Sequence, residues 1–372
     1  MKILFDASTL YSIKGGGIYN YLVKLLPRLI EKAKASSDQL ILLNLYFRKK
    51  GSLPDSISEK YPTLSFRFPV KLLNHFWIKY SFPDMSLFFN NIDIVHSPHF
   101  SLPVMSRTKK ILTVNDITYL KYPEYFRPAD RKLNDYGYKK LLPVNIKRAD
   151  RIIAISQHTK DELLDYFKIP PEKVSVVHIG CDIPPQYSHD DINKKLAKYN
   201  LIKDEFIYFP VGSIEPRKNI NRTVTAFSKT KSRKIKLVIS GVGNSDWLKA
   251  IDTTSVIMLQ WDNESDKNAL FQGSLFVVYP SLYEGFGMPL VEAMGNGKAV
   301  LTSNTTSLKE ISGGAAFTVN PENIDEIING FNLLINNNTL RSDLEIKSLT
   351  RAKCFTWDKM TDSIYDVYKS TQ

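Results

Sequence analysis

Short apolar runs typical of buried strands alternate along this chain with segments whose apolar residues recur at helical spacing. The strands expected in the first half are 1–10, 40–47, 65–70, 92–96, 110–114, 151–155 and 174–178. The strands expected in the second half are 206–211, 236–240, 256–259, 275–279 and 299–303. Strands that alternate with helices favour parallel sheets, so the sequence predicts an α/β protein with two doubly wound, Rossmann-like domains.

A polar stretch over 182–201, which contains Pro184-Pro185, separates the two halves and predicts a linker. We therefore expect a domain over 1–190 and another over 191–354. The length of 372 residues agrees, because single cores rarely grow beyond about 250–300 residues.

The stretch VVYPSLYEGFGMPLVEAMGNGKAVL (277–301) predicts a strand, a loop with Gly285 and Gly287, and a helix. Such a loop directs backbone N–H groups and a positive helix end at a ligand, which favours an anion. Glu284 and Glu292 would repel a phosphate, so we interpret them as partners of sugar hydroxyls. A diphosphate joined to two sugars would suit this arrangement.

Two further strand ends carry features that suit a phosphate ligand. Gly16 and Gly17 follow the first strand and would let a ligand approach the backbone, although the stretch is not a G-x-G-x-x-G fingerprint. A tight connection without a ligand is the alternative. Arg217 and Lys218 follow the strand at 206–211, where a planar guanidinium and a point charge could bind a diphosphate.

Polar side chains also follow two strands of the first half. His96 and His99 end the strand at 92–96, and Asn115 and Asp116 end the strand at 110–114. All four are candidates for a site at the carboxyl edge of a parallel sheet. A lone histidine in such a place is more often a structural group, whereas Asn115 and Asp116 are two adjacent polar groups.

Charge is unevenly distributed along the chain. Residues 1–190 carry 28 Lys and Arg against 18 Asp and Glu, whereas the remainder carries 22 against 20. A basic, aromatic first half favours an anionic partner: a membrane, a phosphorylated acceptor or nucleic acid. A solubilising surface charge is the alternative. The bulky apolar stretch 72–89 could touch lipid, but a pair of core helices is the interpretation we favour.

Several classes of protein are disfavoured by the sequence. We expect neither a signal peptide nor a membrane span, and the two cysteines, Cys181 and Cys354, fit packing positions in a reducing cytosol. No D-x-D carboxylates, His/Cys metal spacing or P-loop is present. The acids of 262–266 suit a turn and a helix cap, so no metal site is expected.

Two motifs in combination, VGSIEPRKNI (211–220) and YEGFGMPLVEAM (283–294), resemble family 4 of the retaining GT-B glycosyltransferases. Glu284 and Glu292 have the spacing E-x7-E of that family. The resemblance covers almost the whole chain, including the motifs TVNDITYLKYPEYF (113–126), AISQHTKDEL (154–163), VHIGCD (177–182) and FTWDKMTDSIYDVY (355–368).

The resemblance implies a role for each matching residue. Arg217 and Lys218 would bind the donor diphosphate, Glu284 the donor sugar and Glu292 the ribose, so that both acids are free to bracket the donor. Gly16 and Gly17 would approach the phosphates, and 355–372 would return to the first domain. The remaining residues expected along the nucleotide-sugar are Gly212, Ser213, Leu259, Gln260, Trp261, Gly285, Phe286, Gly287, Met288 and Leu290.

One departure from the family concerns the reaction centre. Asn115 stands where the family usually has a histidine beside the donor sugar, and an amide cannot titrate near neutral pH. Asp116 therefore becomes the candidate polar or acid/base group near the acceptor.

The resemblance implies a cytoplasmic, metal-independent enzyme that uses GDP-mannose and a lipid-linked glycan acceptor in bacterial O-antigen or other surface polysaccharide synthesis. Such an enzyme would bind peripherally to the anionic inner face of the plasma membrane, and no nucleic acid is expected as a partner. UDP- or dTDP-sugars and a soluble acceptor are alternatives, and a non-enzymatic basic binding protein is a third.

Overall fold

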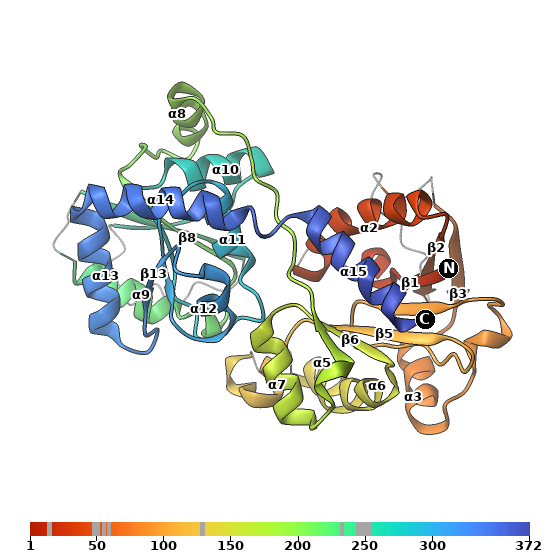
Figure 1. The fold of residues 1–372 in the computed structure, drawn as a ribbon. Coiled ribbons are helices and arrows are strands. Elements are labelled where there is room, and N and C mark those ends of the chain that lie inside the picture. Colours follow the sequence, from red (N-terminus) through yellow and green to blue (C-terminus); the bar gives the residue numbers. More distant parts are fainter. Residues whose placement is uncertain are drawn as a thin grey trace. The chain divides into compact units, whose positions relative to one another are not determined.

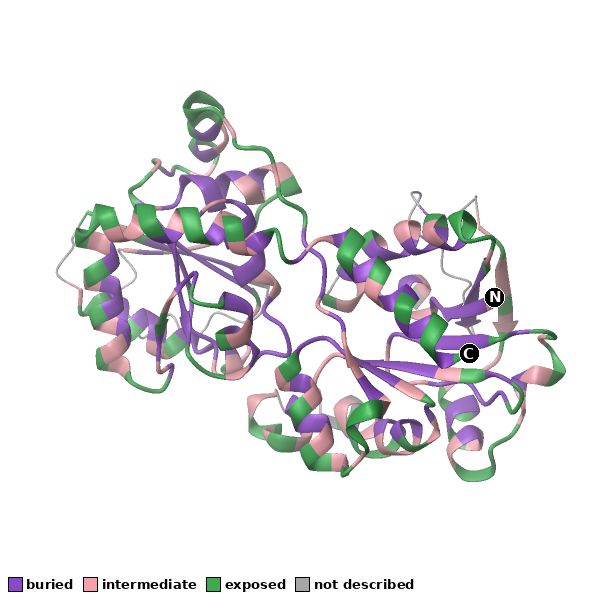
Figure 2. Cartoon of the chain, in the orientation of Figure 1, coloured by how far each residue is buried: buried purple, intermediate pink, exposed green. Residues whose placement is uncertain are grey.

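The computed structural model describes residues 1–12, 17–46, 53, 57, 61–126, 131–230, 234–242 and 255–372. By its contacts the chain divides into two units, each built around one parallel sheet with helices against it (Figure 1). Unit 1 comprises Met1–Lys121, Pro128–Gly180 and Trp357–Gln372, and unit 2 comprises Tyr122–Arg127 and Cys181–Thr356. The inner strands of both sheets are almost entirely buried (Figure 2), as expected for parallel sheets covered on both faces, whereas the strands at the sheet edges are partly exposed.

The strands of unit 1 are β1 (Lys2–Asp6), β2 (Gln39–Tyr46), β3 (Thr63–Arg67), β4 (Ile94–Ser97), β5 (Lys109–Val114), β6 (Arg151–Ala154) and β7 (Val174–Val176). Its helices are α1 (Ser8–Ser12), α2 (Gly17–Ala35), α3 (Val70–Tyr80), η1 (Met85–Leu87), α4 (Thr118–Lys121), α5 (Arg131–Asn134), the π-helix η4 (Asp135–Leu141), α6 (Leu142–Arg148), α7 (Gln157–Phe167), η5 (Pro171–Lys173) and α15 (Trp357–Thr371).

The sheet of unit 1 has the order β3-β2-β1-β4-β5-β6-β7, and every pair of neighbours is parallel. Helix α2 forms because apolar side chains recur at helical spacing, and it buries Leu22, Leu25, Leu26 and Leu29. The C-terminal helix α15 packs against α2 within this unit (Figure 1).

The strands of unit 2 are β8 (Phe206–Ser213), β9 (Lys236–Val242), β10 (Val256–Leu259), β11 (Val277–Tyr279), β12 (Val300–Ser303) and β13 (Phe317–Val319), in the order β10-β9-β8-β11-β12-β13. Its helices are η2 (Pro123–Tyr125), α8 (His189–Ala197), η6 (Pro216–Lys218), α9 (Ile220–Ser228), α10 (Glu264–Gly273), α11 (Met288–Gly295), α12 (Thr306–Ser312), α13 (Ile324–Asn336) and α14 (Asn338–Ala352).

Three expectations need correction in detail. The stretch 182–201, expected as a linker, contains α8, which packs on α10 inside unit 2. The stretch 72–89 forms one helix and a single 3₁₀ turn instead of two core helices. Cys181 is buried as expected, but Cys354 is exposed and does not pack in the interior. None of the described helices is long and apolar enough to cross a membrane.

Candidate functional site

The strand order of unit 2 places two loops side by side. The chain leaves β8 toward β9 on one side, and β11 lies against β8 on the other, paired through Tyr208 and Val277. Ligands of open α/β sheets bind where the order reverses in this way, at the carboxyl ends of the strands. The loops that follow β8 and β11 carry Arg217 and Glu284, so the fold brings the two predicted motifs together.

Two hydrogen bonds hold these two loops against each other. The backbone N–H of Leu282 donates to the Arg217 carbonyl at 2.8 Å, and the side-chain amide of Asn219 donates to the Pro280 carbonyl at 3.0 Å. Asn219 has a left-handed conformation with φ of 59°, which ends η6 and begins α9. The loop after β8 therefore presents Arg217 and Lys218 to the loop after β11 at a fixed register.

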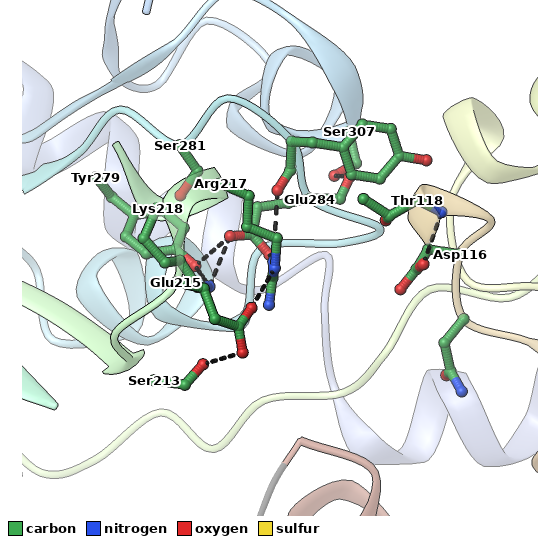
Figure 3. A network of polar contacts seen from close by, with 12 residues as sticks. Asp116, Thr118, Ser213, Glu215, Arg217, Lys218, Tyr279, Ser281, Glu284 and Ser307 are labelled. Atoms are coloured by element: carbon green, nitrogen blue, oxygen red, sulfur yellow. Dashed lines mark hydrogen bonds and ion pairs between the residues drawn. The ribbon is translucent and has the colours of Figure 1, made fainter. Parts of the chain in front are cut away.

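Glu284 is the centre of the polar cluster in Figure 3. Its Oε2 accepts a hydrogen bond from Arg217 Nη1 at 2.8 Å, and its Oε1 accepts one from Lys218 Nζ at 2.6 Å. The Tyr279 hydroxyl also donates to Oε1 at 2.7 Å and accepts from Lys218 Nζ at 2.6 Å. The Glu284 side chain is 9% exposed, so these are buried, charge-assisted contacts.

A second carboxylate completes the cluster. Glu215 accepts from Arg217 Nε at 2.7 Å and from Ser213 Oγ at 2.7 Å. Glu215, Arg217, Lys218 and Glu284 therefore contribute two negative and two positive charges. The charges of this cluster therefore balance, and Glu284, which we expect to contact the sugar, pairs with both cations.

These charges control the ionisation of Glu284. Burial alone would raise the pKa of Glu284, but the charges of Arg217 and Lys218, with hydrogen bonds from Lys218 and Tyr279, lower it to about 2. Burial and the neighbouring Arg217 lower the pKa of Lys218, while Glu284 opposes them. Near neutral pH Glu284 is an ionised acceptor, which can bind hydroxyl groups but has no proton to donate.

The glycine loop after Glu284 has a conformation that its sequence explains. Gly287 has φ of 99°, where any other residue would be strained, and a Cβ there would lie 2.5 Å from Leu308 Cδ2, so Leu308 would have to shift. Ser307 Oγ donates to the Glu284 carbonyl at 2.7 Å, which fixes the start of the loop that contains Gly285. Phe286 is buried against Phe355, with ring centroids 5.7 Å apart.

Helix α11 follows this loop and carries the second acid. Met288 begins the helix, Leu290 is buried in the core, and Glu292 lies one turn after Met288. Glu292 Oε1 is 3.0 Å from Lys267 Nζ, which also pairs with Glu264 at 2.7 Å. The two acids raise the pKa of Lys267 although its burial acts in the opposite direction, so Lys267 is a cation that orients Glu292.

The same lysine connects Glu292 to the carboxyl end of β10. Lys267 Nζ lies 5.4 Å from the ring centroid of Trp261, which is 37% exposed. Gln260 beside it is also exposed, and Leu259 ends β10. An aromatic ring, a cation and a carboxylate thus lie together at the edge where the base and ribose were expected. Gly212 lies near the end of β8, with φ of 69° and open space at its Cβ position.

In unit 1, the residues predicted after β5 have several polar partners. Asp116 Oδ1 accepts from the Thr118 N–H at 2.9 Å (Figure 3) and from the Tyr138 hydroxyl at 2.9 Å. Burial raises the pKa of the Tyr21 hydroxyl on α2, and the Asn115 side chain acts on it in the opposite direction. Gly17 begins α2 and is exposed with open space at its Cβ position, whereas Gly16 lies outside the described residues.

The two candidate histidines of unit 1 are held by neighbouring groups. His96 Nδ1 lies 2.7 Å from the Tyr368 hydroxyl and Nε2 lies 2.8 Å from Thr113 Oγ1. Burial lowers the pKa of His96 to about 3, so it is a neutral link between the sheet and α15. Burial also lowers the pKa of His99 to about 4, although Asp116 opposes this.

Sequence reasoning did not identify three participants. Tyr279 was expected only as the apolar end of a strand, yet its hydroxyl bridges Lys218 and Glu284. Lys267 and Glu215 were not singled out, although Glu215 lies within the motif that contains Arg217. The signal available for Tyr279 was its position at the end of the strand, immediately before Pro280. Among the described residues, no three or more His, Cys, Asp or Glu side chains form a group that could hold a metal ion.

Comparisons with known proteins agree with this architecture. The family model of glycosyl transferases group 1 matches residues 191–349, and that of glycosyltransferase family 4 matches residues 47–183. O-antigen chain mannosyltransferase B of Escherichia coli is 30% identical over 289 residues, which cover 74% of each chain. O-antigen chain mannosyltransferase RfbU of Salmonella typhimurium is 25% identical over 323 residues, which cover 83% of this chain and 84% of that protein.

Solved structures share the fold at much lower identity. Sucrose-phosphate synthase from Thermosynechococcus elongatus has a TM-score of 0.73 and 16% identity, with 99% of this chain and 98% of that chain covered. Anabaena HepE, in complex with UDP and glucose, has a TM-score of 0.70 and 17% identity over the full length of both chains. The chain therefore belongs to glycosyltransferase family 4, and it is a group 1 glycosyltransferase with the GT-B fold.

Proposed function

We propose that this glycosyltransferase transfers mannose from GDP-mannose, with retention of configuration, to a lipid-linked glycan in bacterial O-antigen or other surface polysaccharide synthesis. The observation that carries the donor class is the buried cluster in which Arg217 and Lys218 meet Glu284 at the switch point of unit 2. Two cations and an ionised carboxylate match the two parts of a nucleotide-sugar, its diphosphate and its sugar hydroxyls.

Donor binding exchanges partners within this cluster. The diphosphate takes hydrogen bonds from Arg217 and Lys218, whose charges are balanced by Glu215 and Glu284. Glu284 also accepts hydrogen bonds from the sugar hydroxyls. Arg217 and Lys218 are therefore paired with acids before the donor binds. When they turn to the diphosphate, Glu284 accepts hydrogen bonds from the sugar hydroxyls in their place.

In the transfer step the bond between the anomeric carbon and the diphosphate oxygen breaks, and a bond to the acceptor oxygen forms on the same face. The acceptor's proton passes to the leaving phosphate oxygen, as is usually proposed for this family. Negative charge accumulates on the diphosphate as the bond breaks, so Arg217 and Lys218 stabilise the transition state more than the ground state. Each such preorganised group contributes roughly 3–4 kcal/mol in a site that excludes water.

The remaining site residues have supporting roles in this proposal. Glu292, oriented by Lys267, binds the ribose hydroxyls, and Leu259, Gln260 and Trp261 border the base. We assign contacts with the phosphates and sugar to Gly16, Gly17, Gly212, Ser213 and the backbone N–H groups of Phe286 to Val291, except Pro289. We assign Asn115 and Asp116 roles toward the reacting sugar and the acceptor. The cations supply the positive charge at the diphosphate, so we expect transfer to continue in the presence of a metal chelator.

Support for mannose and for a lipid-linked acceptor comes from the names of the relatives, two of which are O-antigen chain mannosyltransferases. The HepE complex with UDP and glucose supports the alternative of a UDP-sugar donor. The likeness to sucrose-phosphate synthase supports the alternative of a soluble acceptor. A lipid-linked acceptor would bring the enzyme to the cytoplasmic face of an anionic membrane. No nucleic acid takes part.

A donor panel tests this proposal. Thermal unfolding is followed with GDP, UDP and dTDP, and with GDP-mannose, UDP-glucose and dTDP-rhamnose, each at one fixed concentration. A ligand present at 100 times its Kd stabilises the folded protein by about 2.7 kcal/mol, which is readily measured. We expect GDP-mannose to give the largest shift and to be the donor consumed in a transfer assay. A larger shift and faster consumption with UDP- or dTDP-sugars would overturn the assignment of mannose.

A further inference from the structure

The loop that follows β10 in unit 2 carries residues that we assign to the donor's base, yet its side chains are exposed. The loop consists of Gln260, Trp261, Asp262 and Asn263, and α10 begins at the next residue. We call these four residues the β10 loop. None of the four side chains is buried, so polar contacts must set the position of the loop.

The turn that ends α8 presents a lysine and a tyrosine to this loop. The Tyr199 hydroxyl donates to Asp266 Oδ2 at 2.8 Å and accepts from the backbone N–H of Asp262 at 3.3 Å. Lys198 Nζ lies 3.0 Å from Asp266 Oδ2 and also pairs with Asp262. One hydroxyl group thus connects the first turn of α10 to the backbone of the β10 loop. We call Lys198, Tyr199, Asp262 and Asp266 the clamp.

Asp266 is the buried member of the clamp, with 6% of its surface exposed. It accepts a further hydrogen bond from Asn263 Nδ2 at 3.2 Å, and its own N–H donates to Asn263 Oδ1 at 2.9 Å, which caps α10. Burial alone would raise the pKa of Asp266, but hydrogen bonds from Lys198 and Tyr199 lower it. Asp266 is therefore an ionised acceptor that takes donors from the loop and from the end of α8.

Helix α8 is packed closely enough on α10 to act as a fixed support (Figure 1). Its buried residues are Ile192 and Leu196, and a Cβ at Gly273 of α10 would lie 2.6 Å from Leu196 Cδ1. Glycine at this position lets the two helices approach each other. Gln272 Nε2 donates to the Pro185 carbonyl at 3.0 Å and holds the segment before α8. The clamp therefore fixes an exposed loop to a packed helix.

The β10 loop also contacts the cation that orients Glu292. The ring centroid of Trp261 lies 5.4 Å from Lys267 Nζ, which lies 3.0 Å from Glu292 Oε1. Lys267 follows Asp266 directly in α10, so the clamp and the group that orients Glu292 share one helix. A displaced β10 loop would move Trp261 away from this helix. It would not move the diphosphate-binding cations, which lie in the loop after β8.

We propose that Tyr199 is a positioning residue for recognition of the donor's base. Its hydroxyl holds the β10 loop where Trp261 contacts the face of the base and Gln260 its edge. Such contacts depend on distance and direction, so a loop displaced by about 1 Å loses most of them. The inference rests on the proposed function, because it takes the ligand of the β10 loop to be the base of a nucleotide-sugar.

Calorimetric titration of the full-length protein with GDP, UDP and inorganic pyrophosphate tests the inference. Pyrophosphate has neither base nor ribose, so it reports the diphosphate contacts alone. Tyr199→Phe removes one hydroxyl and should bind the preferred nucleotide about tenfold more weakly. Its preference between GDP and UDP should fall by a similar factor, and its affinity for pyrophosphate should not change. A tyrosine that only stabilised the fold would leave the ratio of these affinities as it is in wild type.

Tyr187→Phe is the matched control. Tyr187 is partly exposed, as Tyr199 is, and its hydroxyl lies 3.1 Å from Ser265 Oγ on the same helix α10. This variant should bind all three ligands as wild type does. Lys198→Gln is a second test of the clamp, because Lys198 is exposed and its loss should not unfold the protein. It should reduce the nucleotide preference by up to about fivefold. Circular dichroism should show all three variants folded.

Three results would overturn the inference. The first is a wild type that binds GDP and UDP equally, the second is an unchanged nucleotide preference in Tyr199→Phe, and the third is an equal loss in Tyr187→Phe. A preference of wild type for UDP would instead overturn the proposed GDP-mannose donor. The inference would then stand or fall on whether Tyr199→Phe reduces the preference for UDP. A wild type that binds neither nucleotide would overturn both.

Discussion

The ion pairs of Glu284 predict a pH-dependent stability difference between the wild type and Glu284→Gln. The pKa of Glu284 is lowered from 4.5 to about 2, and the side chain is buried. At 1.36 kcal/mol per pKa unit, this corresponds to about 3 kcal/mol of folding free energy near neutral pH. Removing the charge also leaves Arg217 and Lys218 with one acid, so a cost of about 3–5 kcal/mol is expected at pH 7.

The sign of the pH dependence follows from the lowered pKa. A carboxyl whose pKa is lower in the folded state stabilises that state fully above its unfolded pKa of about 4.5, and the contribution disappears as the pH falls toward 2. Glutamine has no such titration. The difference in unfolding free energy between wild type and variant should therefore shrink by about 3 kcal/mol between pH 6 and pH 2. The other titrating groups are the same in both proteins, so their contributions cancel in this difference.

Urea unfolding at several pH values measures this difference, and hydrogen exchange at β8 and β11 assigns it to unit 2, with the strands of unit 1 as an internal reference. Glu345→Gln is the matched control, because Glu345 pairs with Lys298 at 3.1 Å but is one third exposed. It should cost about 0–1 kcal/mol. A difference between Glu284→Gln and wild type that stays constant from pH 6 to pH 2 would refute the reasoning.

Three further substitutions have defined outcomes. Arg217→Ala should lower turnover by about 10²–10³, and near-normal turnover in a steady-state assay would remove its role at the leaving diphosphate. Lys267→Met should leave Glu292 without its cation, so the affinity of GDP, measured by calorimetry, should fall close to that of 2′-deoxy-GDP. An unchanged ratio of the two dissociation constants would show that Lys267 does not orient Glu292 for ribose. Tyr279→Phe removes a hydroxyl bonded to both Lys218 and Glu284 and should cost about 1–3 kcal/mol in urea unfolding, whereas no measurable cost would mean that water replaces the hydroxyl.

The cluster at the switch point shows how far sequence reasoning reaches. The strand, glycine loop and helix around Glu284 follow from local periodicity, and so does the position of Arg217 after a strand. Their direct contact does not, because it depends on β8 and β11 being neighbours, and strand order is not encoded in a local pattern. The ion pairs that hold Glu284 were missed for this reason, and Tyr279 was missed because its apolar neighbours indicate only a buried strand.

The stretch 72–89 shows a different limit. Helix α3 is apolar on two adjacent faces, and periodicity cannot tell which face the rest of the unit covers. The core interpretation is right for Leu73, Trp77 and Met85 and wrong for Leu87 and its exposed neighbours. In 182–201 the two prolines and the charged residues concealed the short helix α8, whose apolar contacts are made by two residues, Ile192 and Leu196. The segment Tyr122–Arg127 belongs to unit 2 through tertiary contacts that no local pattern reports.

The central claim is that Glu284, paired with Arg217 and Lys218, binds the sugar of a nucleotide-sugar. Calorimetric titration of wild type and Glu284→Gln with the preferred nucleoside diphosphate, and with its sugar conjugate, tests this most directly. In wild type the sugar should increase affinity. In Glu284→Gln the diphosphate alone should bind at least as tightly as before, because a neighbouring negative charge is gone, and the sugar should add little. An equal gain from the sugar in both proteins would contradict the account.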